Sequence, residues 1–317
     1  MMPEVNHESR SPVFILCPPR SYSTIATALL SGHPEIYAFP ELLIFSARTV
    51  GELLVKGSRR RDDKEPPTQG QFRAVRLTGL LRTVAQLHED SQEDAPILRA
   101  VDWLTERSDW SMKQLFDYLL TLVHPRIGLE KSPTTILADA NLRRCLDAYP
   151  QARYIHLTRH PVSAQKSMQA HTALIHPQSS PRQTVVTAAT TWYLGHRRAT
   201  QALATIPRRN WLRIQAEQLL SEPRTWLPYI LDWLDIGYDD TIIEAMLRTD
   251  RWDFAGTGPS GRLYGGDYKF MASPALRPVE KPAPRGFDPD WGLLDEMKKR
   301  MTALATEFGY QVTEDSR

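Results

Sequence analysis

The chain has 317 residues, 41% of them hydrophobic, which is enough for one large domain or two small ones with a sizeable core. Its 39 basic and 37 acidic residues leave a net charge of +2, which argues against a general binder of nucleic acid. Cys17 and Cys145 lie among apolar residues without metal-ligand spacing, which indicates buried free thiols. A polar N-terminus, with no apolar run long enough for a signal or a membrane span, predicts a cytoplasmic protein.

The first predicted unit, Val13 to Glu41, is a strand, a loop and a helix. An apolar run over Val13–Cys17 is followed by two prolines, and a helix is predicted over Ile25–Leu30. Backbone N–H groups at a helix N-terminus lack partners and carry partial positive charge, so this loop predicts an anion-binding site. The loop consists of Arg20, Ser21, Tyr22, Ser23 and Thr24.

The middle of the chain alternates predicted helices and strands. A charged stretch over 56–70, with Arg59, Arg60 and Arg61, predicts a solvated surface loop. Apolar spacing predicts helices over 72–88, 110–123, 134–149, 162–168, 184–203, 226–234 and 290–309, and strands over 127–129, 152–158 and 211–215.

Alternation of strand and helix is typical of a parallel sheet, whose right-handed crossovers bring the carboxyl ends of the strands to one edge. Cys17, Lys131 and Arg159 each follow such a strand. No repeat or domain boundary is visible, so we expect a single domain over 1–317.

The stretch over 255–286 is rich in glycine and proline and is predicted to be a long loop without regular structure. Its glycines would allow the backbone to approach a ligand, and Arg262 and Lys269 supply positive charge. We interpret this stretch as a cofactor-covering loop; a loop without a ligand is the alternative.

A second anion site is predicted at the end of the strand over 152–158. The Arg159 guanidinium offers two parallel donors to a phosphate, and Ser167 on the following helix can add a third. The loop at Arg20 lacks the GxxxxGK[ST] pattern, so an ordinary ATPase or kinase mechanism has weak support.

Together, RSYST after one strand and RHPVSAQKS after another resemble the 5′ and 3′ phosphosulfate-binding motifs of sulfotransferases that use 3′-phosphoadenosine 5′-phosphosulfate (PAPS). The order Arg20, Ser21, His33-Pro34, Glu41 is similar to the carboxylate-base branch, which includes tyrosylprotein sulfotransferases and the sulfotransferase domains of polyketide and olefin synthases. The resemblance implies a P-loop NTPase-like three-layer α/β sandwich with a central parallel sheet, and a role in secondary metabolism.

The resemblance also implies residue roles. The 3′-phosphate would bind Arg159 and Ser167, with Lys269 or His171 joining them, and the 5′-phosphosulfate would lie on the loop at Arg20. Lys131 matches the lysine that meets the sulfuryl and bridging oxygens. Two positions depart from the pattern: a tyrosine, Tyr22, replaces the usual glycine, and Ala216 replaces the tyrosine before the glutamate of the fourth motif, IQAEQLLSEP.

An acceptor hydroxyl needs a base, and Glu41 lies among apolar residues that would raise its proton affinity. The alternatives are that Glu41 caps or salt-bridges a helix start, that Lys131 is a surface lysine, and that Arg159 pairs with an acid. The other histidines, His124, His156, His176 and His196, are interpreted as structural.

We therefore expect a PAPS-dependent O-sulfotransferase that needs no metal. It would act on a small-molecule or carrier-tethered hydroxyl acceptor, in a pocket shaped by an insertion over 47–120. A noncatalytic nucleotide-binding module and a phosphotransferase are the alternatives. An acid at 41 and a lysine at 131 favour the enzyme, because binding alone needs no base.

Overall fold

The computed structural model describes residues 10–58, 77–175, 178–258, 265–277, 279–280 and 283–313. The predicted surface loop begins inside helix α2 (Val50–Ser58), and its arginines 59–61 lie outside the described residues, as do Arg262 and His176.

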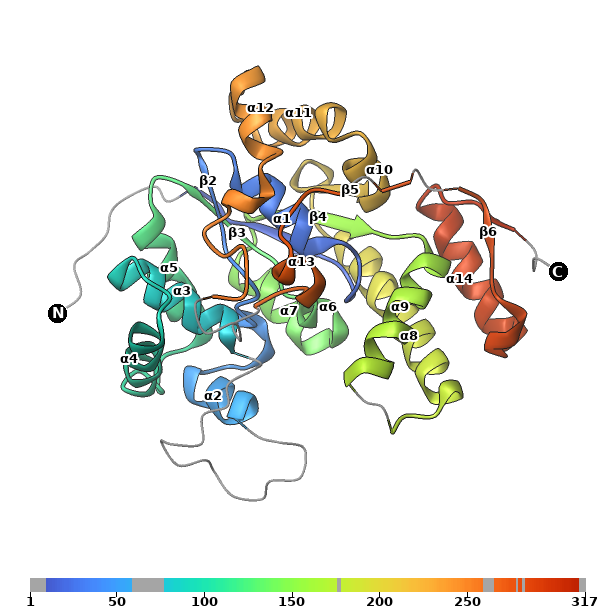
Figure 1. Cartoon of the computed structure of the whole chain (residues 1–317), viewed down its shortest axis with the longest axis horizontal. Helices are drawn as coiled ribbons and strands as arrows, with labels where there is room; N and C mark the ends of the chain where they lie inside the picture. Colours follow the sequence, from blue (N-terminus) through green and yellow to red (C-terminus); the bar gives the residue numbers. More distant parts are fainter. Residues whose placement is uncertain are drawn as a thin grey trace.

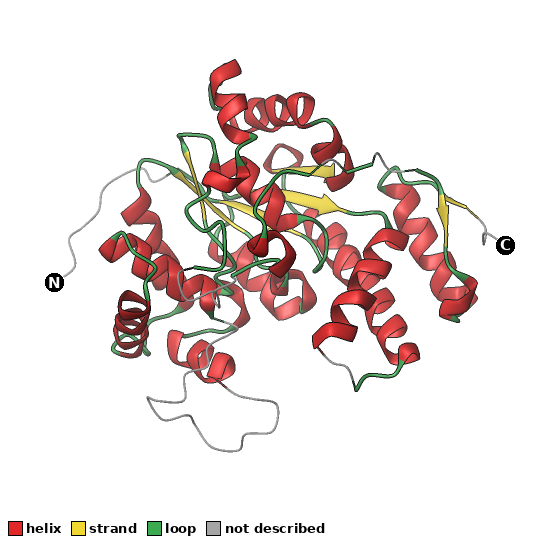
Figure 2. Cartoon of the chain, in the orientation of Figure 1, coloured by secondary structure: helices red, strands yellow, loops and turns green. Residues whose placement is uncertain are grey.

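A central sheet of five parallel strands runs through the molecule in the order β2-β3-β1-β4-β5 (Figure 2). Strand β1 is the middle strand and pairs with β3 on one side and β4 on the other. All four of its residues are buried, as expected for the central strand of a covered parallel sheet. The strands are β1 (Val13–Leu16), β2 (Ile36–Ala38), β3 (Ile127–Glu130), β4 (Arg153–Thr158) and β5 (Trp211–Gln215).

Helices cover both faces of this sheet (Figure 1). Because side chains alternate along a strand, Val13 and Ile15 pack into one hydrophobic cluster, while Phe14 and Leu16 pack into another. The first cluster lies under α1 (Ser23–Ser31), α10 (Ala216–Ser221), α11 (Pro223–Leu234) and α12 (Asp240–Met246). The second lies under α2, α3 (Thr78–Glu89), α4 (Asp94–Thr105), α5 (Met112–Val123), α6 (Thr134–Leu137) and α7 (Asp139–Ala148).

A smaller hydrophobic cluster surrounds the buried Trp192. The helices that form it lie beside the sheet (Figure 1). The Trp192 indole N–H donates to the Arg159 carbonyl at 3.0 Å. The elements here are α8 (Pro161–Ile175), α9 (Pro181–Leu203), α14 (Asp295–Glu307) and the parallel pair β6 (Arg285–Gly286) and β7 (Val312–Thr313).

The predicted three-layer α/β fold with a central parallel sheet is confirmed. Both cysteines are buried and free, also as predicted. Among the described helices, none combines the length and apolar character needed to span a bilayer.

The predicted secondary structure was incomplete and in two places wrong. Strands β2, β6 and β7 and helices α2, α4, α10 and α12 were not predicted, and the predicted loop over 255–286 contains a short helix, α13 (Tyr268–Ala272). The predicted helix over 134–149 is broken at Ala138, which is extended. Arg198 explains this break, because its guanidinium donates to the Leu137 carbonyl at 3.0 Å and replaces a helical hydrogen bond.

Replacing Phe14 by alanine should destabilise the fold by about 3–5 kcal/mol, because its ring packs against four others and the cavity cannot collapse. The ring centroids of Phe45, Phe116, Tyr149 and Tyr154 lie 5.3, 5.8, 5.4 and 5.8 Å away. Urea unfolding measures the change. Leu98→Ala, at a side chain 63% exposed, is the control and should change stability by less than about 0.5 kcal/mol; equal effects would contradict the core assignment.

Candidate active site

The loop between β1 and α1 contains two residues in the left-handed region, Arg20 (φ 66°) and Tyr22 (φ 60°). Tyr22 is the N-cap of α1 and makes no side-chain capping bond. The N–H groups of the first helical turn have no intrahelical carbonyl to meet, so they are available to an anion. Ser21 Oγ is buried and has no hydrogen-bond partner among the described residues, a state that an oxygen-rich anion would relieve.

The loop after β3 carries Lys131, whose side chain is 1% exposed. Its ammonium donates to Glu41 Oε1 at 2.7 Å and to Thr24 Oγ1 at 3.2 Å. Lys131 is therefore not a surface lysine, and it joins the mouth of α1 to the proposed base.

Glu41 lies between β2 and a short 3-10 helix, η1 (Ile44–Ser46), and its side chain is 29% exposed. Its backbone N–H donates to the Gly265 carbonyl at 2.9 Å. A Cβ on Gly79 of α3 would lie 2.1 Å from the Glu41 carbonyl oxygen, and one on Gly265 would lie 2.8 Å from the Gly79 Cα. The backbone at Glu41 therefore packs closely against two neighbouring glycines.

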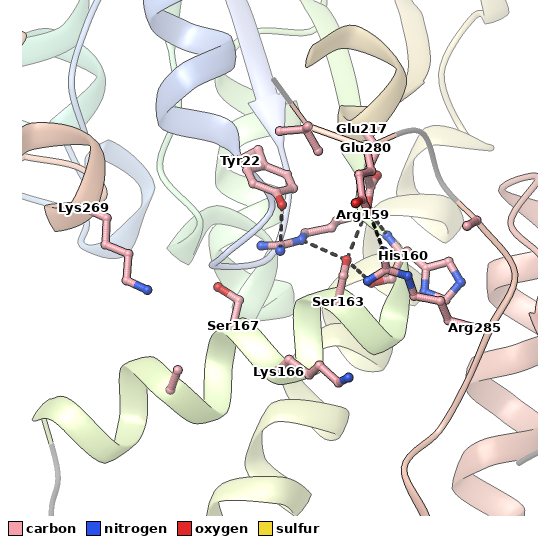
Figure 3. Close-up of a pocket in the computed structure, with 13 residues that line it drawn as sticks. Tyr22, Arg159, His160, Ser163, Lys166, Ser167, Glu217, Lys269, Glu280 and Arg285 are labelled. Carbon is pink, nitrogen blue, oxygen red and sulfur yellow. Dashed lines mark hydrogen bonds and ion pairs between the residues drawn. The ribbon is translucent and has the colours of Figure 1, made fainter. Parts of the chain in front are cut away.

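Arg159 follows β4 and ties the second loop to the first. Its guanidinium donates to the Arg20 carbonyl at 2.6 Å, to Tyr22 Oη at 3.0 Å and to Ser163 Oγ at 3.1 Å. It also lies over the Tyr22 ring, 3.8 Å from the centroid. Tyr22, which replaces the usual glycine, therefore holds the Arg159 guanidinium through its hydroxyl and its ring (Figure 3).

A cavity of about 550 Å³ opens beside Arg159, and its lining is rich in cations and hydroxyls (Figure 3). Ser167 and Lys269, both expected near a phosphate, line it together with Tyr22. Five further polar residues, to which no role was predicted, also line it: His160, Ser163, Lys166, Glu280 and Arg285.

The segment that begins at Gly265 crosses the mouth of α1. The Asp267 N–H donates to Thr24 Oγ1 at 2.9 Å, and its carboxylate pairs with Arg20 at 2.8 Å. The other side of the Arg20 guanidinium donates to Ser167 Oγ at 3.1 Å, so Ser167 contacts Arg20 while Ser163 contacts Arg159. His171 stacks on Tyr268 of this segment.

The loops that carry Arg20, Lys131 and Arg159 therefore meet at one edge of the sheet, with the Glu41 carboxylate beside Lys131. The family model for sulfotransferases matches residues 12–240. The chain belongs to the sulfotransferase family. No curated protein matches this sulfotransferase significantly.

Solved structures with the same fold include two sulfotransferase domains that confirm the predicted resemblance. The domain from the curacin biosynthetic pathway is 19% identical with a TM-score of 0.71, and covers 96% of this chain and 99% of its own. The domain from the Synechococcus PCC 7002 olefin synthase is 23% identical with a TM-score of 0.71, covering 97% and 98%. STF9 from Mycobacterium avium is 15% identical with a TM-score of 0.54, covering 97% and 78%.

Glu217, the glutamate of the fourth motif, accepts hydrogen bonds that fix the loop after β4 of this sulfotransferase. Its carboxylate accepts from the His160 N–H at 2.9 Å, from Ser163 Oγ at 3.3 Å and from the Tyr310 hydroxyl at 2.8 Å. Ser163 therefore links this buried acid to Arg159. Position 163 is one helical turn after Arg159, a spacing that could have identified it from the sequence.

The buried groups of the sulfotransferase have strongly displaced pKa values. Burial raises the pKa of Glu130 to about 7, against the hydrogen bonds from Ser132 and the Leu42 N–H and the charge of Lys131. Burial also lowers the pKa of Arg159, so a bound anion would compensate a desolvated cation. His156 and His196 contact each other at 2.9 Å in the core, in line with a structural role.

Glu130 should make the stability of the protein fall as pH rises. Its pKa is 4.5 in an ordinary environment and about 7 when folded, so between these values the folded state holds a proton that the unfolded state has released. Each pH unit then removes up to about 1.4 kcal/mol, roughly 3 kcal/mol across the window. Urea unfolding of wild type and Glu130→Gln between about pH 4 and pH 8 measures this. Parallel stability curves for the two proteins would contradict the assignment.

Proposed function

We propose that this sulfotransferase transfers a sulfuryl group from PAPS to a hydroxyl of a small-molecule or carrier-tethered acceptor. The observation that carries the proposal is the position of Lys131, whose ammonium lies within hydrogen-bond distance of both Thr24 at the anion loop and Glu41. A cation for the donor and a base for the acceptor are thus adjacent, as an in-line transfer requires.

The loop from Arg20 to Thr24 would hold the 5′-phosphosulfate. Support comes from the N-terminus of the nine-residue helix α1, the Arg20 guanidinium and the unpartnered Ser21 hydroxyl. Ser23 and Thr24 are buried at the same helix mouth. In this role, Arg20 exchanges its ion pair with Asp267 for the phosphate oxygens of the donor.

The cavity beside Arg159 would hold the 3′-phosphate. Arg159, Lys166, Lys269 and Arg285 supply positive charge around it, and Ser163 and Ser167 supply hydroxyls (Figure 3). The hydrogen bond from Arg159 to the Arg20 carbonyl fixes the relative position of the two anion sites. A donor with phosphates on both its 5′ and 3′ positions matches this pair of sites.

In the reaction, Glu41 would accept the proton of the acceptor hydroxyl, and Lys131 would stabilise the negative charge that develops on the leaving phosphate. PAPS supplies the activated sulfuryl group. Since Lys131 is paired with Glu41, its movement toward the donor would leave the carboxylate free to take a proton. A noncatalytic nucleotide-binding module is not favoured, because it needs neither a base nor this arrangement.

The acceptor would reach Glu41 from the side of the segment over 47–120. Helix α3 of this segment supports the proposal, since Gly79 packs directly against the backbone of Glu41. The two similar domains come from the curacin pathway and an olefin synthase, which favours an acceptor of secondary metabolism, either free or tethered to a carrier protein.

Glu41→Gln should lower kcat about 100- to 10,000-fold, because a neutral amide cannot accept the acceptor proton. An acceptor found by a labelled-PAPS screen provides the assay, and calorimetry with 3′-phosphoadenosine 5′-phosphate (PAP) should show undiminished binding. Glu52→Gln, on α2 and ion-paired to Arg48, is the control. Near-normal turnover of Glu41→Gln would remove Glu41 from the role of base.

Arg159→Ala should weaken PAP binding about 10- to 100-fold, the value of one or two charge-assisted hydrogen bonds. Binding of adenosine 5′-phosphate, which lacks the 3′-phosphate, should change much less. The control is Arg153→Ala at the opposite end of the same strand. Equal losses for both nucleotides in calorimetry would refute the assignment of the 3′-phosphate to Arg159.

A further inference from the structure

Two side chains that flank Lys131 hold the backbone that follows Glu41. The Glu130 carboxylate accepts a hydrogen bond from the Leu42 N–H at 3.2 Å. The Ser132 hydroxyl accepts one from the Leu43 N–H at 2.9 Å, and donates its own proton to the Glu130 carboxylate. Two consecutive N–H groups are thus fixed by one buried acid and one serine.

Each residue of the tripeptide 41–43 therefore contacts one residue of the tripeptide 130–132. The outer residues of the second, Glu130 and Ser132, bind the backbone of Leu42 and Leu43, and its central residue binds the Glu41 carboxylate. Residues 130–132 lie at the carboxyl end of β3, which is paired on both sides in the sheet, whereas residues 41–43 follow the edge strand β2.

The backbone conformation of Leu43, which these hydrogen bonds hold, is unfavourable for a residue with a side chain. Leu43 has φ 59° and ψ 25°, in the left-handed region that a side chain with a Cβ adopts at a cost of roughly 1–2 kcal/mol. The bond from its N–H to Ser132 helps to keep this conformation. If the bond is lost, Leu43 can relax to a negative φ, and the chain at Glu41 turns with it.

A buried acid at position 130 carries a free-energy cost. Glu130 is 1% exposed, and the desolvation that raises its pKa is a cost that an apolar side chain of similar size would avoid. The Leu42 N–H would, however, then lose its acceptor, and the Ser132 hydroxyl would lose the carboxylate to which it donates. The Glu130 carboxylate satisfies both groups and sets their positions.

We propose that Glu130 and Ser132 are positioning residues for Glu41, and that they hold its carboxylate in the position from which it accepts the acceptor proton. This inference rests on the proposed function, in which Glu41 is the base. Neither residue contacts the donor or the acceptor in this role, and each acts only through the conformation of residues 41–43.

The decisive experiment is Ser132→Ala in the wild-type protein and in Glu41→Gln. In wild type, kcat should fall about 10- to 100-fold, the cost of displacing a reacting group by about 1 Å, while the Kd of PAP stays within about twofold. In Glu41→Gln, the same change should lower the residual kcat less than about twofold, because no base remains to be misplaced. A full loss in both backgrounds would overturn the proposal.

Ser46→Ala is the matched control. Its hydroxyl bonds Thr134 at 2.9 Å between the same two segments, but it does not bind the backbone beside Glu41. This variant should keep kcat within about threefold of wild type. A loss equal to that of Ser132→Ala would show that general loosening, and not the position of Glu41, lowers activity.

Glu130 is tested with two variants of similar volume. Glu130→Gln keeps an oxygen acceptor for the Leu42 N–H and should retain at least about tenfold more activity than Glu130→Met, which has none. Equal kcat values for two folded variants would contradict a role for this hydrogen bond. If the methionine variant does not fold, the Ser132 comparison still decides.

A crystal structure of Ser132→Ala with PAP tests the inference without any acceptor. Compared with the wild-type complex, Leu43 should leave the left-handed region, and the Glu41 carboxylate should be displaced by about 1 Å or more. A superimposable Glu41 would overturn the positioning role. Absence of sulfuryl transfer by the wild-type protein would instead overturn the proposed function, so the two failures are distinguishable.

Discussion

The arrangement of the site depends on the parallel pairing of β3, β1 and β4. Parallel strands end at the same edge, and the register that aligns Phe14 with Glu130 and Tyr154 places the three following loops side by side. Arg20, Lys131 and Arg159 belong to these loops. The three loops thus bring one cation each to the same place. The core beneath the strands keeps these loops in position.

The cations gathered there are held by partners within the protein. Arg20 pairs with Asp267, Lys131 pairs with Glu41, and Arg159 donates to Tyr22, Ser163 and the Arg20 carbonyl. Like charges at close distance would otherwise destabilise the folded chain. In the function proposed here, donor binding exchanges some of these partners, and the exchange at Lys131 frees the carboxylate that receives the acceptor proton.

The errors of the sequence analysis have identifiable physical causes. Strand β2 has only three residues and owes its existence to pairing with β3, which no local pattern records. Helix α13 is five residues long, lies in a glycine-rich stretch and is capped by Asp267. The break at Ala138 comes from Arg198, sixty residues away in the chain. Strand β2 and the break at Ala138 depend on distant contacts, which periodicity does not report, and α13 is too short to produce a periodic pattern.

The amino-acid sequence by itself determined the alternation of strand and helix, hence the parallel sheet, and the motifs around Arg20, Lys131 and Arg159 that mark a sulfotransferase. These are local signals: apolar runs, prolines, and an arginine before a helix. Only the tertiary structure decided that Ser163 rather than Ser167 contacts Arg159, that Tyr22 supports that arginine, and that residues 130–132 hold residues 41–43. Hydrogen bonds between segments about ninety residues apart depend on the packing of the whole sheet, which short sequence patterns do not encode.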